Sequence, residues 1–287
     1  MKRYLLPLLM LGLSCKSRTM PTTSVAGTLP PTPAQDAGDS DSKVALKIHV
    51  DRVSIGGSRS FLWARTGVEP AGAPLMMVLH GDGGDAASMR QYVGAELERL
   101  SLGKAHIAYV EGLDRTWETN TANSPNDGPY IDAVRASFTG DAAPRAVYLF
   151  GYSRGGFMAN KLACERSQWV TAIASNAGGA PYATALKDAE GVQRCPGQAP
   201  VASIALHGVD DREVPFADAP WTAGYWAYIN GCDHEAMTTT AESVCRAYIN
   251  CPAATPSWFC AVPGVGHAVW KDAPRVAWTF FESLPSK

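Results

Sequence analysis

The chain has 287 residues, of which 46% are hydrophobic and 18% are charged. This balance is typical of a folded chain with a sizeable core and excludes wholesale disorder. The formal net charge is −2. The chain therefore lacks the basic field that gathers phosphates, and nucleic acid is not an expected partner.

The amino terminus has the order of a secretory signal peptide. Lys2 and Arg3 precede an apolar run from Tyr4 to Leu13, and small residues follow that run. The run is shorter than the roughly 20 apolar residues of a membrane-spanning helix. We predict that residues 1–15 are a signal peptide and that the protein is exported: secreted, periplasmic or lipid-anchored at the cell surface.

Cys15 leaves two processing routes open. Residues 11–15 resemble a bacterial lipoprotein signal, in which a cysteine after a small residue becomes lipidated. Such signals usually carry Leu three places before the cysteine, where this chain has Gly12, so cleavage without a lipid remains an alternative. Contact with a membrane is expected only through a lipid on Cys15. Residues 16–43 are rich in Pro, Thr, Ser and Ala, which predicts a flexible linker.

Residues 44–287 predict one α/β domain. It opens with an antiparallel pair, Val44–Val50 and Arg59–Arg65. Short apolar runs then alternate with helical stretches, which is typical of a mostly parallel sheet with helices on both faces. The predicted strands are Leu75–Leu79, His106–Val110, Ala146–Phe150, Val170–Ala174, Val201–Leu206 and Trp258–Val262. The predicted helices are Ala86–Leu100, Tyr130–Phe138, Gly155–Arg166, Trp221–Ile229 and Ala273–Leu284.

A G-x-S-x-G motif from Gly151 to Gly155 lies directly between a predicted strand and a predicted helix. A serine on such a tight strand-to-helix turn has its hydroxyl raised above the sheet, as in α/β-hydrolases. The alternative is a chance Gly/Ser turn, but the flanking elements favour a nucleophile. We therefore predict that Ser153 is the nucleophile.

A glycine-rich loop, L-H-G-D-G-G from Leu79 to Gly84, follows an earlier predicted strand. Hydrolases of this architecture place a second oxyanion donor there, and backbone N–H groups stabilise the charge that develops on the former carbonyl oxygen. We assign the two donors to the backbone N–H groups of Asp82 and Arg154. A phosphate loop is rejected because no Lys and Ser/Thr pair follows the glycines.

A serine nucleophile needs a base, and the base needs a carboxylate to orient it. His267 is preceded by Gly-Val-Gly and follows the predicted strand Trp258–Val262. The candidate acids are Asp210 and Asp211, which follow an earlier predicted strand. The resulting chain order of serine, acid and histidine is that of α/β-hydrolases.

Six cysteines lie in the carboxy-terminal half of the chain, apart from Cys15. An even set suits an oxidising compartment, and we expect three disulfides. Cys164 ends a predicted helix and Cys195 lies in the loop before the next strand, so we expect these two to pair. The pairing of the other four stays open: Cys232, Cys245, Cys251 and Cys260. Free thiols or a metal site are alternatives, but no paired C-x-x-C occurs with partner histidines, so no metal site is predicted.

Five motifs together resemble one enzyme group: L-H-G-D-G-G, G-Y-S-R-G-G-F-M-A, H-G-V-D-D-R-E-V-P, N-G-C and G-V-G-H-A-V-W. The chain resembles the secreted polyhydroxybutyrate depolymerase and feruloyl esterase group of the α/β-hydrolase superfamily over most of residues 44–287. In that group the acid lies four residues beyond the histidine of the His-Gly pair, which selects Asp211 over Asp210. The resemblance implies a serine carboxylic-ester hydrolase, with a Ser-Asp-His triad, that uses no metal or organic cofactor.

The implied substrates are polyester oligomers or feruloyl and acetyl esters of plant polysaccharides, so the expected partner is an ester, polymeric esters included. Arg154 departs from the small or apolar residue that often follows the nucleophile in the group, and Val269 stands where Trp-Pro is usual before Trp270. Residues 117–129 are polar and predict a long loop over the active edge. Within this loop, we expect Trp117 to contact the substrate. Two alternatives remain: a peptidase or thioesterase with the same triad, and a non-catalytic surface lipoprotein of this fold.

Overall fold

The computed structural model describes residues 46–54, 58–182, 184 and 186–285. The predicted signal peptide with Cys15, the linker at 16–43 and the first residues of the predicted catalytic domain lie outside the described residues. The described residues all belong to one unit, which extends from Lys43 to Lys287.

Twelve strands, five α-helices and three short 3-10 turns lie among the described residues. The strands are β1 (Lys47–Ser54), β2 (Ser58–Arg65), β3 (Leu75–Leu79), β4 (His106–Val110), β5 (Val147–Tyr152), β6 (Ala172–Asn176), β7 (Leu186–Lys187), β8 (Gln193–Arg194), β9 (Ala202–Gly208), β10 (Asp233–Thr239), β11 (Cys245–Ile249) and β12 (Ser257–Val262). The α-helices are α1 (Ala86–Ser101), α2 (Asp127–Ser137), α3 (Arg154–Glu165), α4 (Ala219–Ile229) and α5 (Ala273–Glu282). Short 3-10 turns lie at η1 (Leu113–Arg115), η2 (Gly140–Ala142) and η3 (Phe216–Asp218).

The main sheet has the strand order β1-β2-β4-β3-β5-β6-β9-β12-β11-β10. The six strands from β4 to β12 run parallel to one another, and antiparallel pairs extend the sheet at both edges. The central strands are buried on both faces; every residue of β3 and β4 is buried. This burial explains why their sequences read as continuous apolar runs rather than as alternating ones.

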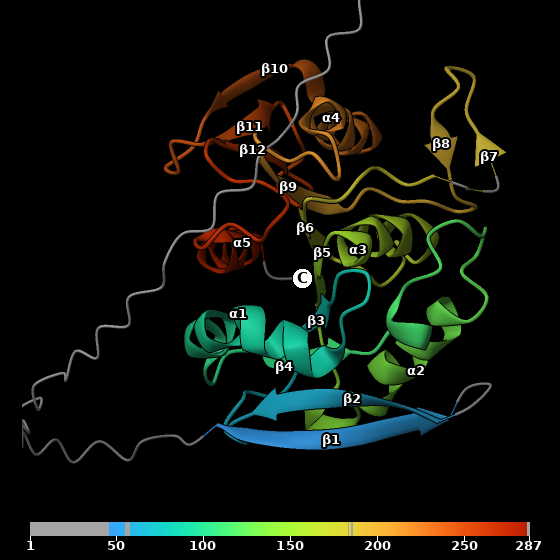
Figure 1. Ribbon diagram of the computed structural model, residues 1–287, viewed down its shortest axis with the longest axis vertical. Coiled ribbons are helices and arrows are strands. Elements are labelled where there is room, and N and C mark those ends of the chain that lie inside the picture. Colours follow the sequence, from blue (N-terminus) through green and yellow to red (C-terminus); the bar gives the residue numbers. More distant parts are fainter. Residues whose placement is uncertain (1–45, 55–57, 183, 185, 286–287) are drawn as a thin grey trace, which may run out of the picture. The chain divides into compact units, whose positions relative to one another are not determined.

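Helices cover both faces of this sheet, as Figure 1 shows. One face packs against α1 and α5 through Met89, Val93 and Phe280, and the other packs against α2, α3 and α4 through residues such as Ile131 and Leu162. The two cores lie on either side of the strands, so the sheet is a rigid platform. Its carboxyl edge carries the loops that contain the predicted site residues.

The edge strands were not all predicted from the sequence. β10 is almost entirely exposed and polar, so it has no apolar alternation and is held mainly by backbone pairing with β11. The strands β7 and β8 have only two residues each, which is too short for an alternating pattern. The predicted loop at 117–129 is shorter than expected, because α2 begins at Asp127.

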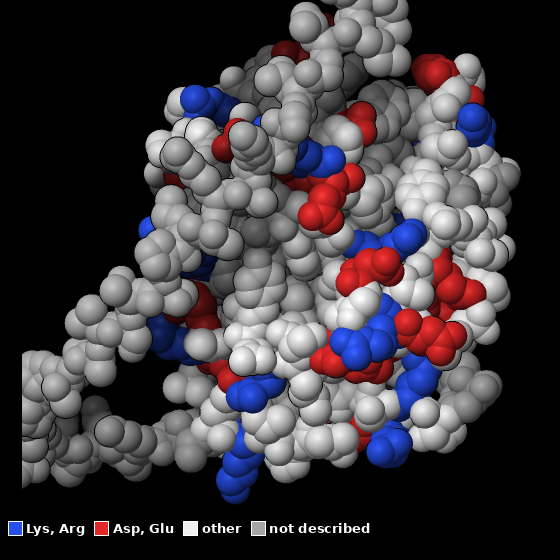
Figure 2. Space-filling model, in the orientation of Figure 1, with Lys and Arg blue, Asp and Glu red and all other residues white. Residues whose placement is uncertain are grey.

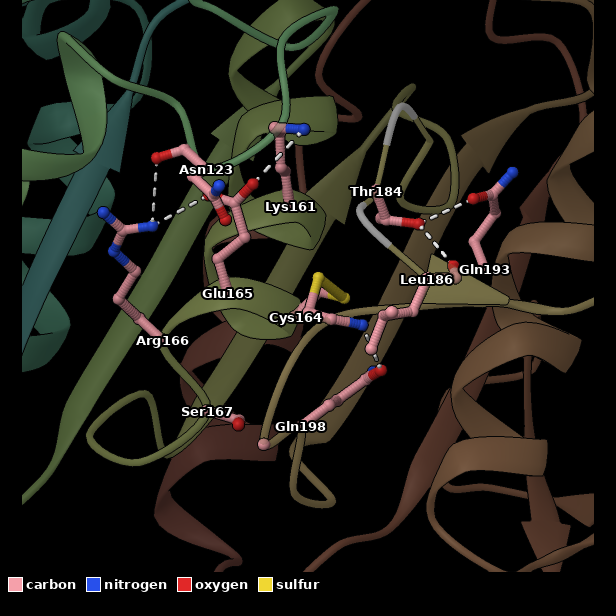
Figure 3. Close-up of a disulfide and its surroundings, with 12 residues drawn as sticks. Asn123, Lys161, Cys164, Glu165, Arg166, Ser167, Thr184, Leu186, Gln193 and Gln198 are labelled. Carbon is pink, nitrogen blue, oxygen red and sulfur yellow. Dashed lines mark hydrogen bonds and ion pairs between the residues drawn. A yellow bond between two sulfur atoms is a disulfide. The ribbon is translucent and has the colours of Figure 1, made fainter. Parts of the chain in front are cut away.

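Three disulfides lie within the described residues, and the expected bond between Cys164 and Cys195 is among them. The other pairs are Cys232–Cys251 and Cys245–Cys260. Figure 3 shows the Cys164 disulfide at the end of α3, near a buried cluster in which Glu165 lies between Lys161 and Arg166. The disulfide fastens the segment after β6 to α3, and Nζ of Lys161 donates to the carbonyl of Tyr182 in the same segment at 3.3 Å.

Acidic and basic side chains lie next to one another on the face seen in Figure 2, in keeping with the near-zero net charge. No helix among the described residues has the length and apolarity needed to cross a bilayer.

Candidate active site

Ser153 occupies a strained turn between β5 and α3. Its φ is 51° and its ψ is −121°, a backbone conformation that costs energy for a residue with a side chain. The turn closes tightly because Gly151 has no side chain: a Cβ there would lie 2.2 Å from the carbonyl oxygen of Gly155. The backbone N–H of Ser153 donates to the carbonyl of Asn176 in the neighbouring strand, at 2.9 Å. These constraints hold the serine hydroxyl above the sheet.

Three loops bring the predicted nucleophile, acid and base together. Ser153 follows β5, Asp211 follows β9 and His267 follows β12, and the carboxyl ends of these parallel strands meet at one edge. Nδ1 of His267 donates to Oδ2 of Asp211 at 2.8 Å. Its Nε2 accepts from the Ser153 hydroxyl, also at 2.8 Å. The imidazole is thus oriented to take a proton from the serine.

The structure separates the two candidate acids. Asp211 is 5% exposed and contacts His267, whereas Asp210 points into solvent. Oδ1 of Asp211 accepts from the backbone N–H groups of Glu213 and Val214, each at 3.0 Å. Burial opposes ionisation, but the hydrogen bonds from His267 and from these two N–H groups outweigh it and hold the pKa of Asp211 below its ordinary value. The carboxylate stays ionised and can stabilise an imidazolium.

Two further side chains lie beside this hydrogen-bonded chain: His207, which the sequence suggests is a structural residue bonded to nearby backbone, and Glu213, which the sequence did not single out. Nε2 of His207 donates to the carbonyl of Val214 at 2.9 Å and lies 3.2 Å from Oδ2 of Asp211. Oε2 of the exposed Glu213 lies 4.0 Å from Nε2 of His267. The contact of His207 with Asp211 was not expected, although its position at a strand end, four residues before the acid, could have indicated it.

The glycine-rich loop after β3 lies against the nucleophile. A Cβ on Gly81 would be 3.4 Å from the Cβ of Ser153, so the backbone of this loop passes directly beside the serine. The side chain of His80 anchors this loop. Its Nδ1 donates to the carbonyl of Gly81 at 2.7 Å, and its Nε2 accepts from the backbone N–H of Gly112 at 2.9 Å. The side chain of Asp82 accepts a short hydrogen bond from the Thr116 hydroxyl.

Arg154 is the first residue of α3, and the N–H groups of a helix's first turn have no acceptor within the helix. Its backbone N–H therefore has the character that an oxyanion donor needs. The side chain also lies at the site: Nη1 donates to the Thr119 hydroxyl at 2.8 Å, and Nε lies 3.8 Å from Oδ1 of Asp82. Thr119 in turn shares a 2.6 Å hydrogen bond with the hydroxyl of Tyr182.

Trp117 does not lie where a substrate could contact it, contrary to the prediction from the sequence. The side chain is only 3% exposed, and its indole N–H donates to the carbonyl of His80 at 2.9 Å. A side chain in this position supports the glycine-rich loop and offers no face to a substrate. The sequence places Trp117 in the loop over the active edge, but the inward orientation depends on packing against His80.

An aromatic groove of about 360 Å³ lies between α3 and the start of α4. Phe157 lies one turn after Ser153, and Trp221, which is 61% exposed, lies across the groove at the start of α4. Tyr182 packs edge-on against Phe157 with ring centroids 5.8 Å apart. Val214, whose backbone N–H donates to Asp211, also lines the groove. The groove therefore connects the element that carries the nucleophile with the loop that carries the acid.

Within the described part of the chain, no group of three or more His, Cys, Asp or Glu side chains is arranged to hold a metal ion.

Comparisons with known proteins give relatives named as esterases. NocK of Nocardia uniformis subsp. tsuyamanensis, named as an inferred esterase, is 32% identical over 189 residues, which are 62% of this chain and 52% of NocK. Feruloyl esterase B of Piromyces equi is 24% identical over 74% of this chain and 43% of its own length. Feruloyl esterase C of Emericella nidulans is 26% identical over 75% of this chain and 76% of its own length. The chain spans about half the length of the first two. No family model matches the chain.

Solved structures share the fold. The acetyl xylan esterase from Aspergillus awamori has a TM-score of 0.63 at 15% identity and covers 81% of this chain and 99% of its own. A fluorophosphonate-binding serine hydrolase of Staphylococcus aureus has a TM-score of 0.54 at 14% identity, over 82% of this chain and 98% of its own. The predicted α/β-hydrolase fold and the resemblance to the feruloyl esterase group are both confirmed.

Proposed function

We propose that the protein is an exported serine carboxylic-ester hydrolase whose triad is Ser153, His267 and Asp211. The observation that carries the proposal is the continuous hydrogen-bonded chain from the serine hydroxyl through the imidazole to the buried carboxylate. The relatives named as esterases support the same reaction class.

In the proposed reaction, Oγ of Ser153 attacks the ester carbonyl carbon while Nε2 of His267 takes the serine proton. Asp211 holds the imidazole and stabilises the positive charge that it gains. The imidazolium then gives its proton to the departing alcohol, which leaves an acyl group on Ser153. A water molecule, deprotonated by His267, attacks this acyl group and releases the acid.

The tetrahedral intermediate carries negative charge on the former carbonyl oxygen. The backbone N–H groups of Asp82 and Arg154 are proposed to bind that oxygen, because the glycine-rich loop and the start of α3 both lie against Ser153. Each such donor is worth about 10²–10³-fold in kcat in enzymes where one has been removed.

The groove formed by Phe157, Tyr182 and Trp221 supports an aromatic acyl group as the preferred substrate part. Aromatic side chains bury a flat ring over a large area, and the groove begins one turn from the nucleophile. We therefore propose feruloyl-type esters of plant polysaccharides as the substrates, ahead of acetyl esters and polyester oligomers.

Export is supported by the three disulfides of the described domain, because such bonds persist in oxidising compartments. The signal peptide at 1–15, a lipid on Cys15 and the linker at 16–43 are part of this proposal.

A substrate panel tests the proposed function. The purified chain should hydrolyse methyl ferulate faster than acetylated xylan or polyhydroxybutyrate, and a fluorophosphonate probe should label Ser153. Matched amide and thioester analogues of the same acyl group separate an esterase from a peptidase or thioesterase. Absence of both labelling and turnover would show instead a non-catalytic protein of this fold, and preference for acetyl or polyester substrates would overturn the aromatic assignment alone.

A further inference from the structure

The loop that carries His267 is hydrogen-bonded to the hydroxyls of two tyrosines, one at His267 itself and one two residues later in the chain. The hydroxyl of Tyr152 donates to the carbonyl of His267 at 2.8 Å. The backbone N–H of Val269 donates to the hydroxyl of Tyr92 at 2.9 Å. The two residues come from different elements, the end of β5 and the middle of α1. The bonds therefore tie one loop to two parts of the rigid scaffold.

The ring of Tyr152 also touches the other parts of the site. A Cβ on Gly81 would lie 3.0 Å from Cδ1 of Tyr152, so the ring lies close against the glycine-rich loop. Its centroid is 5.4 Å from that of His267 and 5.8 Å from that of Tyr92. The side chain of Tyr152 thus contacts both the glycine-rich loop and the loop that carries His267. Its backbone directly precedes Ser153, so Tyr152 links all three parts of the site.

We infer that Tyr152 and Tyr92 are positioning residues that hold the backbone of the histidine loop, so that Nε2 of His267 stays in line with the Ser153 hydroxyl. The inference rests on the proposed function, since it concerns the base of that reaction. A misplacement of about 1 Å in a catalytic group can cost roughly a hundredfold in rate. Loss of one of two restraints should cost less than this.

The Tyr152 hydroxyl keeps the proton that it donates to the His267 carbonyl. Burial, with the nearby Tyr92 hydroxyl and the Glu213 and Asp211 carboxylates, raises the pKa of Tyr152 to about 12. The phenol therefore remains protonated at neutral and mildly alkaline pH. The bond to the His267 carbonyl persists where an esterase of this kind would be assayed.

The test compares Tyr152→Phe and Tyr92→Phe with Tyr148→Phe as a matched control. Tyr148 lies on the same face of β5, four residues earlier, where its ring stacks on Phe281 at a centroid distance of 4.6 Å. Phenylalanine keeps the ring in each case and removes only the hydroxyl. Steady-state hydrolysis of a 4-nitrophenyl ester gives kcat and KM, the rate of fluorophosphonate labelling reports the serine–histidine pair without a substrate, and urea unfolding reports stability.

We expect Tyr152→Phe to lower kcat and the labelling rate about tenfold with KM within a factor of two, and Tyr92→Phe to lower both by a smaller factor. Tyr148→Phe should keep both rates, whatever its stability. If Tyr152→Phe does not fold, Tyr92→Phe decides, because Tyr92 is half exposed and lies on another element. Rates in the folded variants that match those of Tyr148→Phe would overturn the positioning role. A wild-type chain that neither turns over esters nor reacts with the probe would instead overturn the proposed function.

Discussion

The Cys164–Cys195 disulfide should contribute several kilocalories per mole to stability and should also shape the aromatic groove. Cys164 is fully buried in the last turn of α3, and Cys195 directly follows β8 and is 4% exposed. The segment between them includes Tyr182 and Gln193, which line the groove. The double variant Cys164→Ala/Cys195→Ala removes this bond without leaving a free thiol.

The magnitude follows from the 31-residue separation of the two cysteines. In the loop-closure account, a bond across 31 residues removes about 12 cal/mol/K of entropy from the unfolded chain, or about 3.7 kcal/mol at 25 °C. The 19-residue separation of Cys232 and Cys251 gives about 3.2 kcal/mol by the same relation. The two double variants should therefore lose similar amounts of unfolding free energy.

Equilibrium unfolding in urea, followed by tryptophan fluorescence, measures both losses. Activity separates the two variants: loss of the Cys164 bond should raise KM for an aromatic ester, because the groove wall is released, while loss of the Cys232 bond should leave KM near the wild-type value. A loss below about 1 kcal/mol for Cys164→Ala/Cys195→Ala would refute the loop-closure reasoning. Equal KM values in the two variants would refute the link between this bond and the groove.

Three further outcomes are expected. Ser153→Ala should abolish ester hydrolysis and fluorophosphonate labelling while circular dichroism and the urea midpoint stay near wild type; retained turnover would exclude Ser153 as the nucleophile. Asp211→Asn should lower kcat by about 10⁴-fold and Asp210→Asn by less than about twofold, because only Asp211 contacts His267; the reverse ranking in steady-state kinetics would move the acid by one residue. Burial lowers the pKa of His106, whose two ring nitrogens have no hydrogen-bond partner among the described residues, so the unfolded chain binds a proton more readily and stability falls as pH drops through about 6.5. Urea unfolding at pH 7 and pH 5 should show a smaller acid-induced loss in His106→Phe than in wild type, and an identical loss in the two proteins would count against this account.

Local patterns in the sequence determined most of the fold. The bounds of β3 and β4 agree with prediction because both strands are buried on two faces and read as uninterrupted apolar runs. The strand-to-helix context of Ser153 indicated the turn that the structure contains. The pairing of Cys164 with Cys195 followed from the positions of the two residues at the ends of neighbouring elements.

Other features depended on contacts between segments far apart in the chain. β10 was missed because an exposed edge strand needs only backbone pairing and leaves no apolar pattern. The pairing of Cys245 with Cys260 depends on the antiparallel register of β11 and β12, in which these two residues are direct partners. No spacing in the sequence fixes such a register, since a slip of one residue changes every cross-strand neighbour.

The site shows the same division. Residue type and order in the sequence pointed to Ser153 and His267 as the proposed nucleophile and base. Asp211 was selected over Asp210 only through the family resemblance, and its burial against the imidazole supports that choice. The inward turn of Trp117 and the contacts of Tyr92 and Tyr152 with the histidine loop likewise depend on packing between elements. A side chain's residue type sets the chemistry that it can perform, whereas its burial and its partners, which decide whether it performs that chemistry, arise only when distant segments meet at the carboxyl edge of the sheet.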